Sequence, residues 1–157
     1  MGDAEITRIY EKYINTVYKV CFMFLKNETE TEDAVQNVFI KLMNQTKKFE
    51  SDEHIKAWLI VTAKNECKNT LTHWWKSKRT PAEDVKEPSY THDTDKGEIT
   101  ELLNTLPDKY KLPLYLYYYE GYNTQEIAKI LNVNHSSLRT QMVAARGKLK
   151  KIMEDLQ

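Results

Sequence analysis

The chain has 157 residues, and its 23 lysines and arginines balance 23 aspartates and glutamates, so the formal net charge is zero. Four glycines and four prolines are too few for a β-sandwich or β-barrel, which needs many tight turns. No stretch approaches the roughly 18 consecutive apolar residues of a membrane span, so no membrane insertion is expected. The first residues do not resemble a secretory signal, and two separate cysteines exclude a disulfide framework, which indicates a cytoplasmic protein.

The N-terminal part, residues 1–76, is predicted to form three amphipathic helices. Apolar residues recur at spacings of three and four along Ile6–Phe24. A second apolar stripe runs along Thr31–Met43, and its first residue, a threonine, is expected to cap that helix. A polar break at Phe49–Glu53 leads into the third helix, which the pattern places at Asp52–Lys76.

Residues 77–97 are predicted to be a flexible linker. They contain prolines and a glycine among serine, threonine and aspartate, with almost no large aliphatic side chains. Such a segment cannot bury enough apolar surface to offset its ordering entropy. The sequence therefore predicts two small helical domains, residues 1–76 and residues 98–157.

The C-terminal domain is predicted to contain four short helices, of which the last two, Thr124–Leu131 and Ser136–Leu156, form a helix-turn-helix. Ala128 allows a close helix crossing, Asn132 suits a turn position of positive φ, and Val133 is expected to plug the gap between the helices. The free N–H groups at the start of the last helix could receive a phosphate. A plain αα-hairpin is the alternative.

The zero net charge is a sum of opposed segments. Residues 27–40 hold four acids and no base, whereas residues 56–79 hold six bases and one acid. Residues 139–151 hold five bases and no acid. Each segment is either a solvated helix face or a surface for a charged partner.

Aromatic and basic side chains alternate along residues 58–79, where Trp74 and Trp75 precede Lys76, Lys78 and Arg79. Rings and cations on one face suit unstacked bases and a phosphate backbone, although core tryptophans beside a solvated helix end would give the same pattern. The four histidines share no metal-ligand spacing, and there is no phosphate-binding glycine motif. We therefore expect no catalytic site, no metal and no cofactor.

Several motifs in order resemble the extracytoplasmic-function (ECF) branch of the bacterial sigma-70 family. They are EDAVQNVFIKL at residues 32–42, AWLIVTAKN at 57–65, LPDKYK at 106–111, YYYEGY at 117–122, EIA at 126–128 and ARGKL at 145–149. The resemblance implies an all-α protein that directs core RNA polymerase to specific promoters. It also implies a chain that is monomeric when free and is held by an anti-sigma factor.

The resemblance implies that the acidic second helix docks on the coiled-coil clamp of the polymerase β′ subunit, with the β flap as a further contact. The polymerase-binding residues would be Asp33, Gln36, Asn37 and Phe39. At the promoter −10 element, the segment Phe49–Lys56 together with Asn65 would take a flipped base, and basic residues would hold the strand. The −10 residues would be Phe49, Lys64, Asn65, Lys68, Trp74, Lys76, Lys78 and Arg79.

The second helix of the helix-turn-helix would enter the major groove at the −35 element. The residues implied there are Ser136, Ser137, Arg139, Thr140, Gln141, Arg146 and Lys148, the last two of them on phosphate. Two other hypotheses fit the same patterns. One is a helix-turn-helix regulator that acts as a free dimer, and the other is an all-α adaptor without a DNA role.

Overall fold

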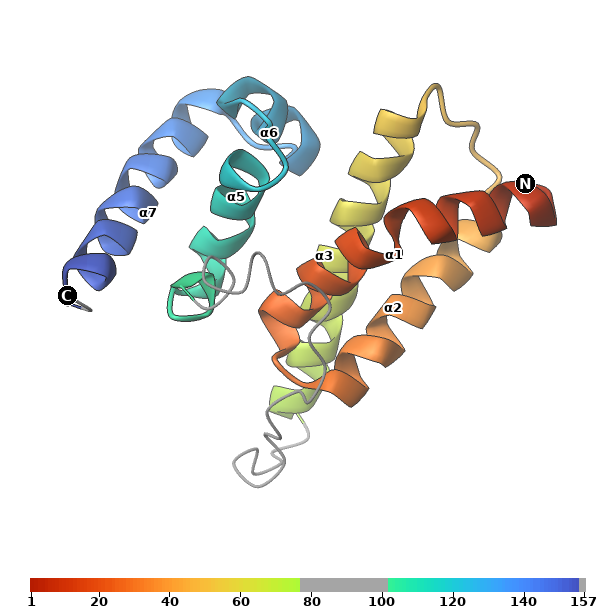
Figure 1. Cartoon of the computed structure of the whole chain (residues 1–157), viewed down its shortest axis with the longest axis horizontal. Coiled ribbons are helices and arrows are strands. Elements are labelled where there is room, and N and C mark those ends of the chain that lie inside the picture. Colours follow the sequence, from red (N-terminus) through yellow and green to blue (C-terminus); the bar gives the residue numbers. More distant parts are fainter. Residues whose placement is uncertain (77–101, 156–157) are drawn as a thin grey trace. The chain divides into compact units, whose positions relative to one another are not determined.

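The structure is a computed structural model that describes residues 1–76, with side chains as far as His73, and residues 102–155 (Figure 1). Within these ranges the regular elements are all helices, which confirms the predicted all-α class. The described residues fall into two compact units. The predicted linker, residues 77–97, lies outside the described residues.

The N-terminal unit contains α1 (Asp3–Leu25), α2 (Glu28–Met43) and α3 (Asp52–Lys76), and each of these helices packs against the other two (Figure 1). The predicted bounds of α3 are confirmed. The core consists of apolar side chains that are fully buried, among them Ile9, Val17, Val20, Val38, Leu42, Leu59, Ile60 and Ala63.

The turn between α1 and α2 differs from the sequence-based prediction. Lys26 adopts the left-handed conformation (φ 54°) and ends α1. Asn27 then caps α2, because its side-chain oxygen accepts a 2.9 Å hydrogen bond from the Glu30 N–H. The prediction that Thr31 is the cap is wrong: Thr31 is fully buried inside α2. Threonine and asparagine are both good caps, and the left-handed turn selects the earlier one.

Two free cysteines lie where α1 packs on α3. Both Cys21 and Cys67 are buried, and the Cys67 thiol donates a 3.7 Å hydrogen bond to the Cys21 carbonyl. Hydrogen bonding with Cys67 and burial raise the pKa of the Cys21 thiol. The Cys21 thiolate is therefore disfavoured, as expected of a packed core cysteine.

The C-terminal unit contains a helical turn at residues 102–104, then α5 (Asp108–Tyr118), α6 (Thr124–Leu131) and α7 (His135–Asp155). The first of the four helices predicted for this domain is therefore described only from residue 102 onward. The buried apolar residues of this unit include Leu103, Leu106, Leu112, Leu114, Leu116, Ile127, Leu138, Met142 and Ala145.

The two helices of the helix-turn-helix are joined as the sequence predicts, with one exception. Asn132 adopts the left-handed conformation (φ 55°), as predicted. Val133 does not plug the gap, because its side chain is 45% exposed. Ile127, at 0% exposed, and Leu138, at 1%, fill the space between the helices instead. The Thr124 hydroxyl and His135 Nε2 lie 2.9 Å apart, which links the start of α6 to the start of α7.

The structure also places a proline inside α5. Pro113 is buried in the second turn of that helix. None of the helices in the described ranges is long and apolar enough to cross a membrane.

Candidate functional site

The outer face of α2 changes from polar to apolar along its length. Asp33, Gln36 and Asn37 are exposed at the positions predicted for a polymerase contact. Ile40 is 51% exposed and Met43 is 55% exposed, and both continue the same face at helical spacing. Sequence reasoning missed them, since Met43 was counted in the buried stripe. The spacing of three and four residues that joins them to Asp33 and Gln36 was the sequence signal that could have placed them on this face.

Phe39, the fourth predicted polymerase contact, has a different environment. Its side chain is 6% exposed and lies edge-on to Tyr10 of α1, with 4.9 Å between the ring centroids. Phe39 therefore belongs to the packing between α1 and α2 that lies beneath the exposed face of α2.

A carboxylate on α3 joins this face to the helix behind it. Glu66 accepts a 3.0 Å hydrogen bond from the Asn37 amide and forms a 2.8 Å ion pair with Lys41. Its side chain is 13% exposed. The side chain of Asn37 thus has a hydrogen-bond partner on α3 of the same unit. That partner, Glu66, directly follows Asn65 in the sequence.

The loop of residues 44–51, which we call the 44–51 loop, lies against the start of α3. Phe49 is half-buried and lies edge-on to His54 at 5.1 Å and to Trp58 at 5.7 Å between ring centroids. The Glu50 N–H donates a 3.1 Å hydrogen bond to His54 Nδ1, and the Ser51 hydroxyl accepts one of 3.1 Å from the His54 N–H. These contacts build an aromatic cluster on one side of the first turns of α3.

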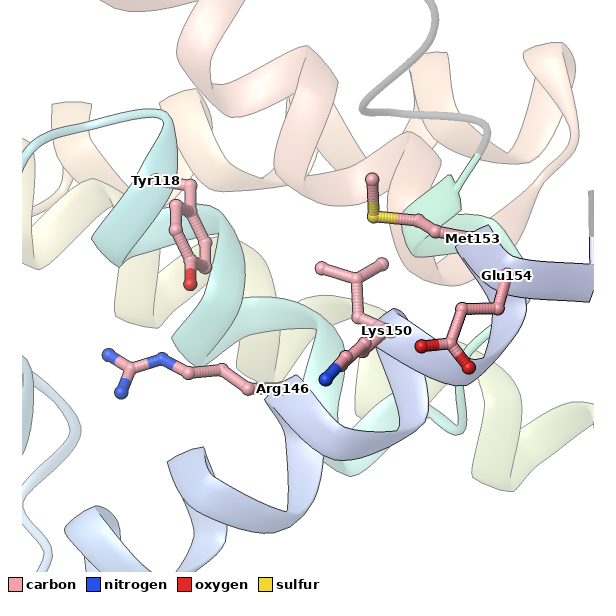
Figure 2. Close-up of a pocket in the computed structure, with 6 residues that line it drawn as sticks. Tyr118, Arg146, Lys150, Met153 and Glu154 are labelled. Carbon is pink, nitrogen blue, oxygen red and sulfur yellow. The ribbon is translucent and has the colours of Figure 1, made fainter. Parts of the chain in front are cut away.

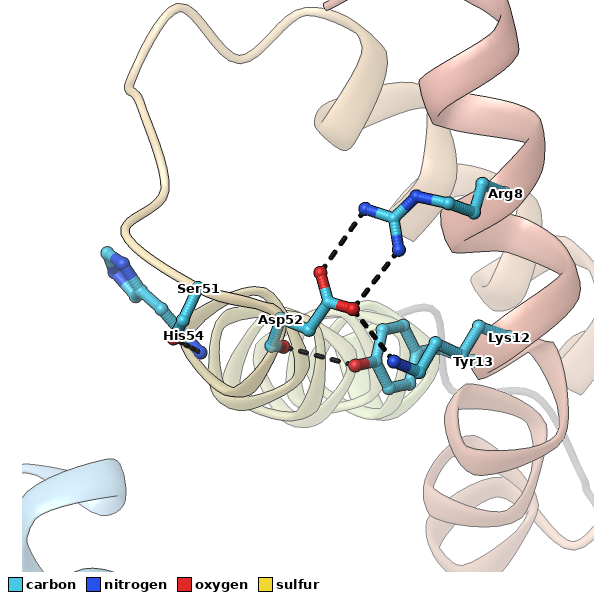
Figure 3. Close-up of polar contacts among 6 residues, drawn as sticks. All are labelled: Arg8, Lys12, Tyr13, Ser51, Asp52 and His54. Atoms are coloured by element: carbon cyan, nitrogen blue, oxygen red, sulfur yellow. Dashed lines mark hydrogen bonds and ion pairs between the residues drawn. The ribbon is translucent and has the colours of Figure 1, made fainter.

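Asp52 fastens the same region to α1 (Figure 3). Its carboxylate accepts hydrogen bonds from both Arg8 Nη groups, at 3.1 and 3.2 Å, and from Lys12 at 2.7 Å. The Tyr13 hydroxyl donates a 3.2 Å hydrogen bond to the Asp52 carbonyl. Hydrogen bonds from Arg8 and Lys12 lower the pKa of Asp52 to about 2.

Asn65, one of the predicted −10 residues, is exposed on the same face of α3 as Trp58, seven residues further along. The rise of an α-helix places them about 10 Å apart along the axis. Lys68 is exposed and Lys64 is half-buried, each beside Asn65. Four other predicted −10 residues are not covered. The side chains of Trp74 and Lys76, and the whole of Lys78 and Arg79, lie outside the described part of the chain.

The first turn of α7 is capped by its own chain. The Asn134 side-chain oxygen accepts hydrogen bonds from the Ser136 N–H at 2.8 Å and the Ser137 N–H at 3.2 Å. The prediction that these N–H groups are free for a phosphate is therefore wrong. Any DNA contact by Ser136 and Ser137, which are both exposed, falls to their hydroxyl groups.

The outer face of α7 presents Arg139 and Thr140, which are exposed as predicted. It also presents Val143, which at 68% is the most exposed of the large apolar side chains in the described ranges. An apolar group in the middle of a polar helix face suits contact with a thymine methyl group. Val143 was not among the residues that the sequence indicated for the −35 element.

The other three predicted −35 residues contact α5. The Gln141 amide donates a 2.7 Å hydrogen bond to the Lys109 carbonyl. The Arg146 guanidinium lies over the Tyr117 ring at 4.7 Å, and its buried Nε has no hydrogen-bond partner. Lys148 is exposed, with its ammonium 6.0 Å from the centre of the Tyr110 ring.

A groove lies between the end of α5 and the C-terminal half of α7 (Figure 2). Its volume is about 570 Å³, and Tyr118, Leu149 and Met153 supply apolar surface beside Arg146, Lys150 and Glu154. Tyr118 is 52% exposed and Met153 is 49% exposed. Figure 2 shows the labelled side chains around this opening. No cluster of three potential metal ligands occurs in the described ranges.

Comparison with known proteins assigns both units. The family model for Sigma-70 region 2 matches residues 9–79, and that for Sigma-70, region 4 matches residues 96–149. The ECF RNA polymerase sigma factor SigM of Bacillus subtilis is 26% identical, over 92% of this chain and 93% of that relative. SigW of the same organism is 27% identical over 99% of this chain and 92% of its own length.

Solved structures show the same fold. The sigma factor RpoE of Bartonella quintana, solved with the anti-sigma factor NepR, aligns with a TM-score of 0.75 at 16% identity, covering 96% of this chain and 97% of that one. CnrH, solved with the cytosolic domain of CnrY, aligns with a TM-score of 0.69 at 17% identity, covering 98% and 90%. Regions 2 and 4 are thus matched in order, and ECF relatives are aligned over most of their length. The chain therefore belongs to the extracytoplasmic-function branch of the sigma-70 family, whose members initiate transcription by binding DNA and are not enzymes.

Proposed function

We propose that this chain brings core RNA polymerase in the cytoplasm to promoters with two sequence elements, and that it opens them at the −10 element. The observation that carries the proposal is the placement of exposed side chains. Each matched region presents, on an exposed helix face, the residues that its part of the task needs: Asp33 and Gln36 on α2, Asn65 on α3, and Arg139 and Thr140 on α7.

The α2 face is the proposed docking surface for the β′ coiled coil. Asp33 and Gln36 provide charge and hydrogen bonding, and Ile40 and Met43 provide apolar area that is open to solvent in the free chain. Interfaces of this kind take most of their binding energy from a few apolar anchors, while charges guide the encounter. Asn37 contributes at the edge, because Glu66 already accepts a hydrogen bond from its amide.

The 44–51 loop and Asn65 are the proposed site of −10 recognition. A base that leaves the stack needs an aromatic or apolar wall and a hydrogen-bonding group at its edge. Phe49 and Trp58 supply the wall, and Asn65 supplies the polar group on the same side of α3. Lys64 and Lys68 lie beside Asn65 and would contact the phosphates of the opened strand.

At the −35 element, α7 would enter the major groove with Ser136, Arg139, Thr140 and Val143 toward the bases. Arginine pairs well with guanine, and valine suits a thymine methyl group. Lys148 and Arg146 would hold phosphates, with Arg146 kept in place by the Tyr117 ring. Gln141 is proposed to anchor the helix through the Lys109 carbonyl, so its part in base reading is secondary.

Two protein partners complete the proposal. The apolar groove beside Tyr118 and Met153 is a suitable surface for the polymerase β flap, since it lies on the C-terminal half of α7, away from the base-reading residues. An anti-sigma factor is the proposed regulator, because the structural neighbours RpoE and CnrH were solved with such a factor and with the cytosolic domain of CnrY.

Transcription with core polymerase on random promoter sequences, followed by sequencing of the start sites, tests the proposal. We expect a two-element promoter, tight binding only when core polymerase is present, and strand opening that falls in Asn65→Ala while binding to core is kept. Asn69→Ala, an exposed asparagine on the same helix, is the matched control. Specific operator binding by a free dimer without polymerase would favour the alternative of a conventional helix-turn-helix regulator.

A further inference from the structure

The 44–51 loop is fastened at its C-terminal end by two separate sets of side chains that the proposed function does not otherwise use. One set comes from α1 and binds Asp52, the first residue of α3. The other is His54, which reaches back to the loop backbone. A loop of this length is conformationally free unless such contacts select one shape.

The Asp52 set joins two helices that the loop itself does not connect. Arg8 and Lys12 are one turn apart on α1, and both bind the same carboxylate (Figure 3). The two cations are half exposed, at 49% and 50%, so they are not needed to fill the core. Tyr13, which is buried, binds the Asp52 carbonyl and fixes the backbone at the same point.

The second fastening, His54, contacts the backbone of the 44–51 loop directly. The Glu50 N–H donates to His54 Nδ1, which requires that this nitrogen carries no proton. The ring of Phe49 is nearly perpendicular to the same imidazole (76°), with 5.1 Å between the ring centroids. One side chain therefore sets the backbone of Glu50 and the ring of Phe49 together.

We infer that His54 and the Arg8–Lys12–Asp52 cluster are positioning residues for −10 recognition, which hold the 44–51 loop in the shape that receives an unstacked base. This inference rests on the proposed function. A loop that is already ordered loses less entropy when a strand binds than a loop that must first be ordered. Loss of either fastening should weaken capture of the −10 strand and leave polymerase docking and −35 binding unchanged.

The first test uses three variants of the full chain, each assembled with core polymerase. His54→Ala removes the acceptor, whereas His54→Asn keeps an acceptor oxygen at nearly the position of Nδ1. His73→Ala removes an exposed histidine further along α3 and is the control. The measurement is the affinity of each holoenzyme for a single strand that carries the −10 element found in the start-site sequencing.

We expect His54→Ala to weaken strand binding by about tenfold, and His54→Asn to return it to within about twofold of the wild type. The control should match the wild type. Equal loss in both His54 variants would overturn the positioning role, because a direct contact of the imidazole with DNA would then explain the effect. No loss in His54→Ala would overturn it as well.

The second test removes the other fastening without touching the loop. Arg8→Met with Lys12→Met keeps the aliphatic stems on α1 and frees Asp52, and Glu11→Gln on the same helix is the control. We expect strand affinity to fall several-fold, with affinity for core polymerase and for −35 duplex within about twofold of the wild type. Unchanged strand affinity would overturn the inference. A wild-type holoenzyme that does not distinguish the −10 strand from a scrambled one would instead refute the proposed function itself.

Discussion

Gln141 on α7 donates a 2.7 Å hydrogen bond to the main-chain carbonyl of Lys109 on α5, and that carbonyl lies four residues before Pro113. In a regular helix the N–H of residue 113 would bind the carbonyl of residue 109, but proline has no N–H. The Gln141 amide therefore takes the place of a missing backbone donor. The same bond fixes α7 against α5.

Replacing Gln141 by alanine should therefore destabilise the α5–α7 contact by about 1–2 kcal/mol, because the Lys109 carbonyl would lose its donor. Hydrogen exchange of the α7 amides in the full chain, read by mass spectrometry, should speed up by about tenfold. Gln125→Ala, an exposed glutamine on α6, is the control.

A second substitution isolates the cause of that loss. In the background of Pro113→Ala, a backbone N–H is restored, so the added effect of Gln141→Ala should become small. Equal effects of Gln141→Ala in both backgrounds would show that the side chain does not compensate for the proline.

The Asp52 carboxylate gives a prediction on acid stability. Its pKa is lowered from 3.8 to about 2 in the folded chain, so it binds a proton less readily there than in the unfolded chain. Its contribution is therefore fully present above about pH 4 and is lost as the pH falls toward 2. Asp52→Asn should be less stable than the wild type at pH 7, with a difference that narrows between pH 4 and 2. Urea unfolding followed by circular dichroism at several pH values measures this, and Glu32→Gln is the control. A difference independent of pH would contradict it.

Ile40 on α2 and Val143 on α7, both exposed and apolar, allow a reciprocal test. Ile40→Asp should weaken binding to core polymerase by about tenfold or more and leave −35 duplex binding by the assembled holoenzyme unchanged. Val143→Asp should do the opposite, because a carboxylate in the major groove faces phosphates and loses the apolar contact. Both side chains are more than half exposed, at 51% and 68%, so neither change should lower stability much. Fluorescence anisotropy with labelled core and labelled duplex distinguishes the two losses, and a pair of variants that fail alike would contradict the assignment.

The Glu66 bridge gives a prediction about the packing of α2 on α3. Glu66→Ala leaves the Asn37 amide and the Lys41 ammonium without their shared acceptor, and we expect a loss of about 1–2 kcal/mol in unfolding free energy. Glu66→Gln keeps one acceptor oxygen and should recover part of it. Tryptophan fluorescence during urea unfolding reports on this unit, since Trp58 lies in α3. Unfolding midpoints equal to that of the wild type in both variants would show that the carboxylate is not the link.

Local signals in the sequence were sufficient where a single residue determines the backbone. The bounds of α3 and the positive φ at Asn132 follow from periodicity and from the conformations that asparagine tolerates. Contacts that depend on a distant partner were not predictable from the sequence. Gln141 has the polarity of a base-reading residue, and its hydrogen bond to the Lys109 carbonyl follows only from the position of α5. Val133 has the size of a core residue, but Ile127 and Leu138 already fill that space.

Because Gln141 is bonded to α5 and the start of α7 is capped by Asn134, we expect the residues that vary with promoter sequence to form one narrow stripe of α7. The stripe consists of Ser136, Arg139, Thr140 and Val143. Its members contribute no buried core surface, so they can change without loss of the fold. A library randomised at these four positions should yield chains with new −35 preferences that still assemble with the same polymerase, which makes this domain a practical starting point for orthogonal gene circuits.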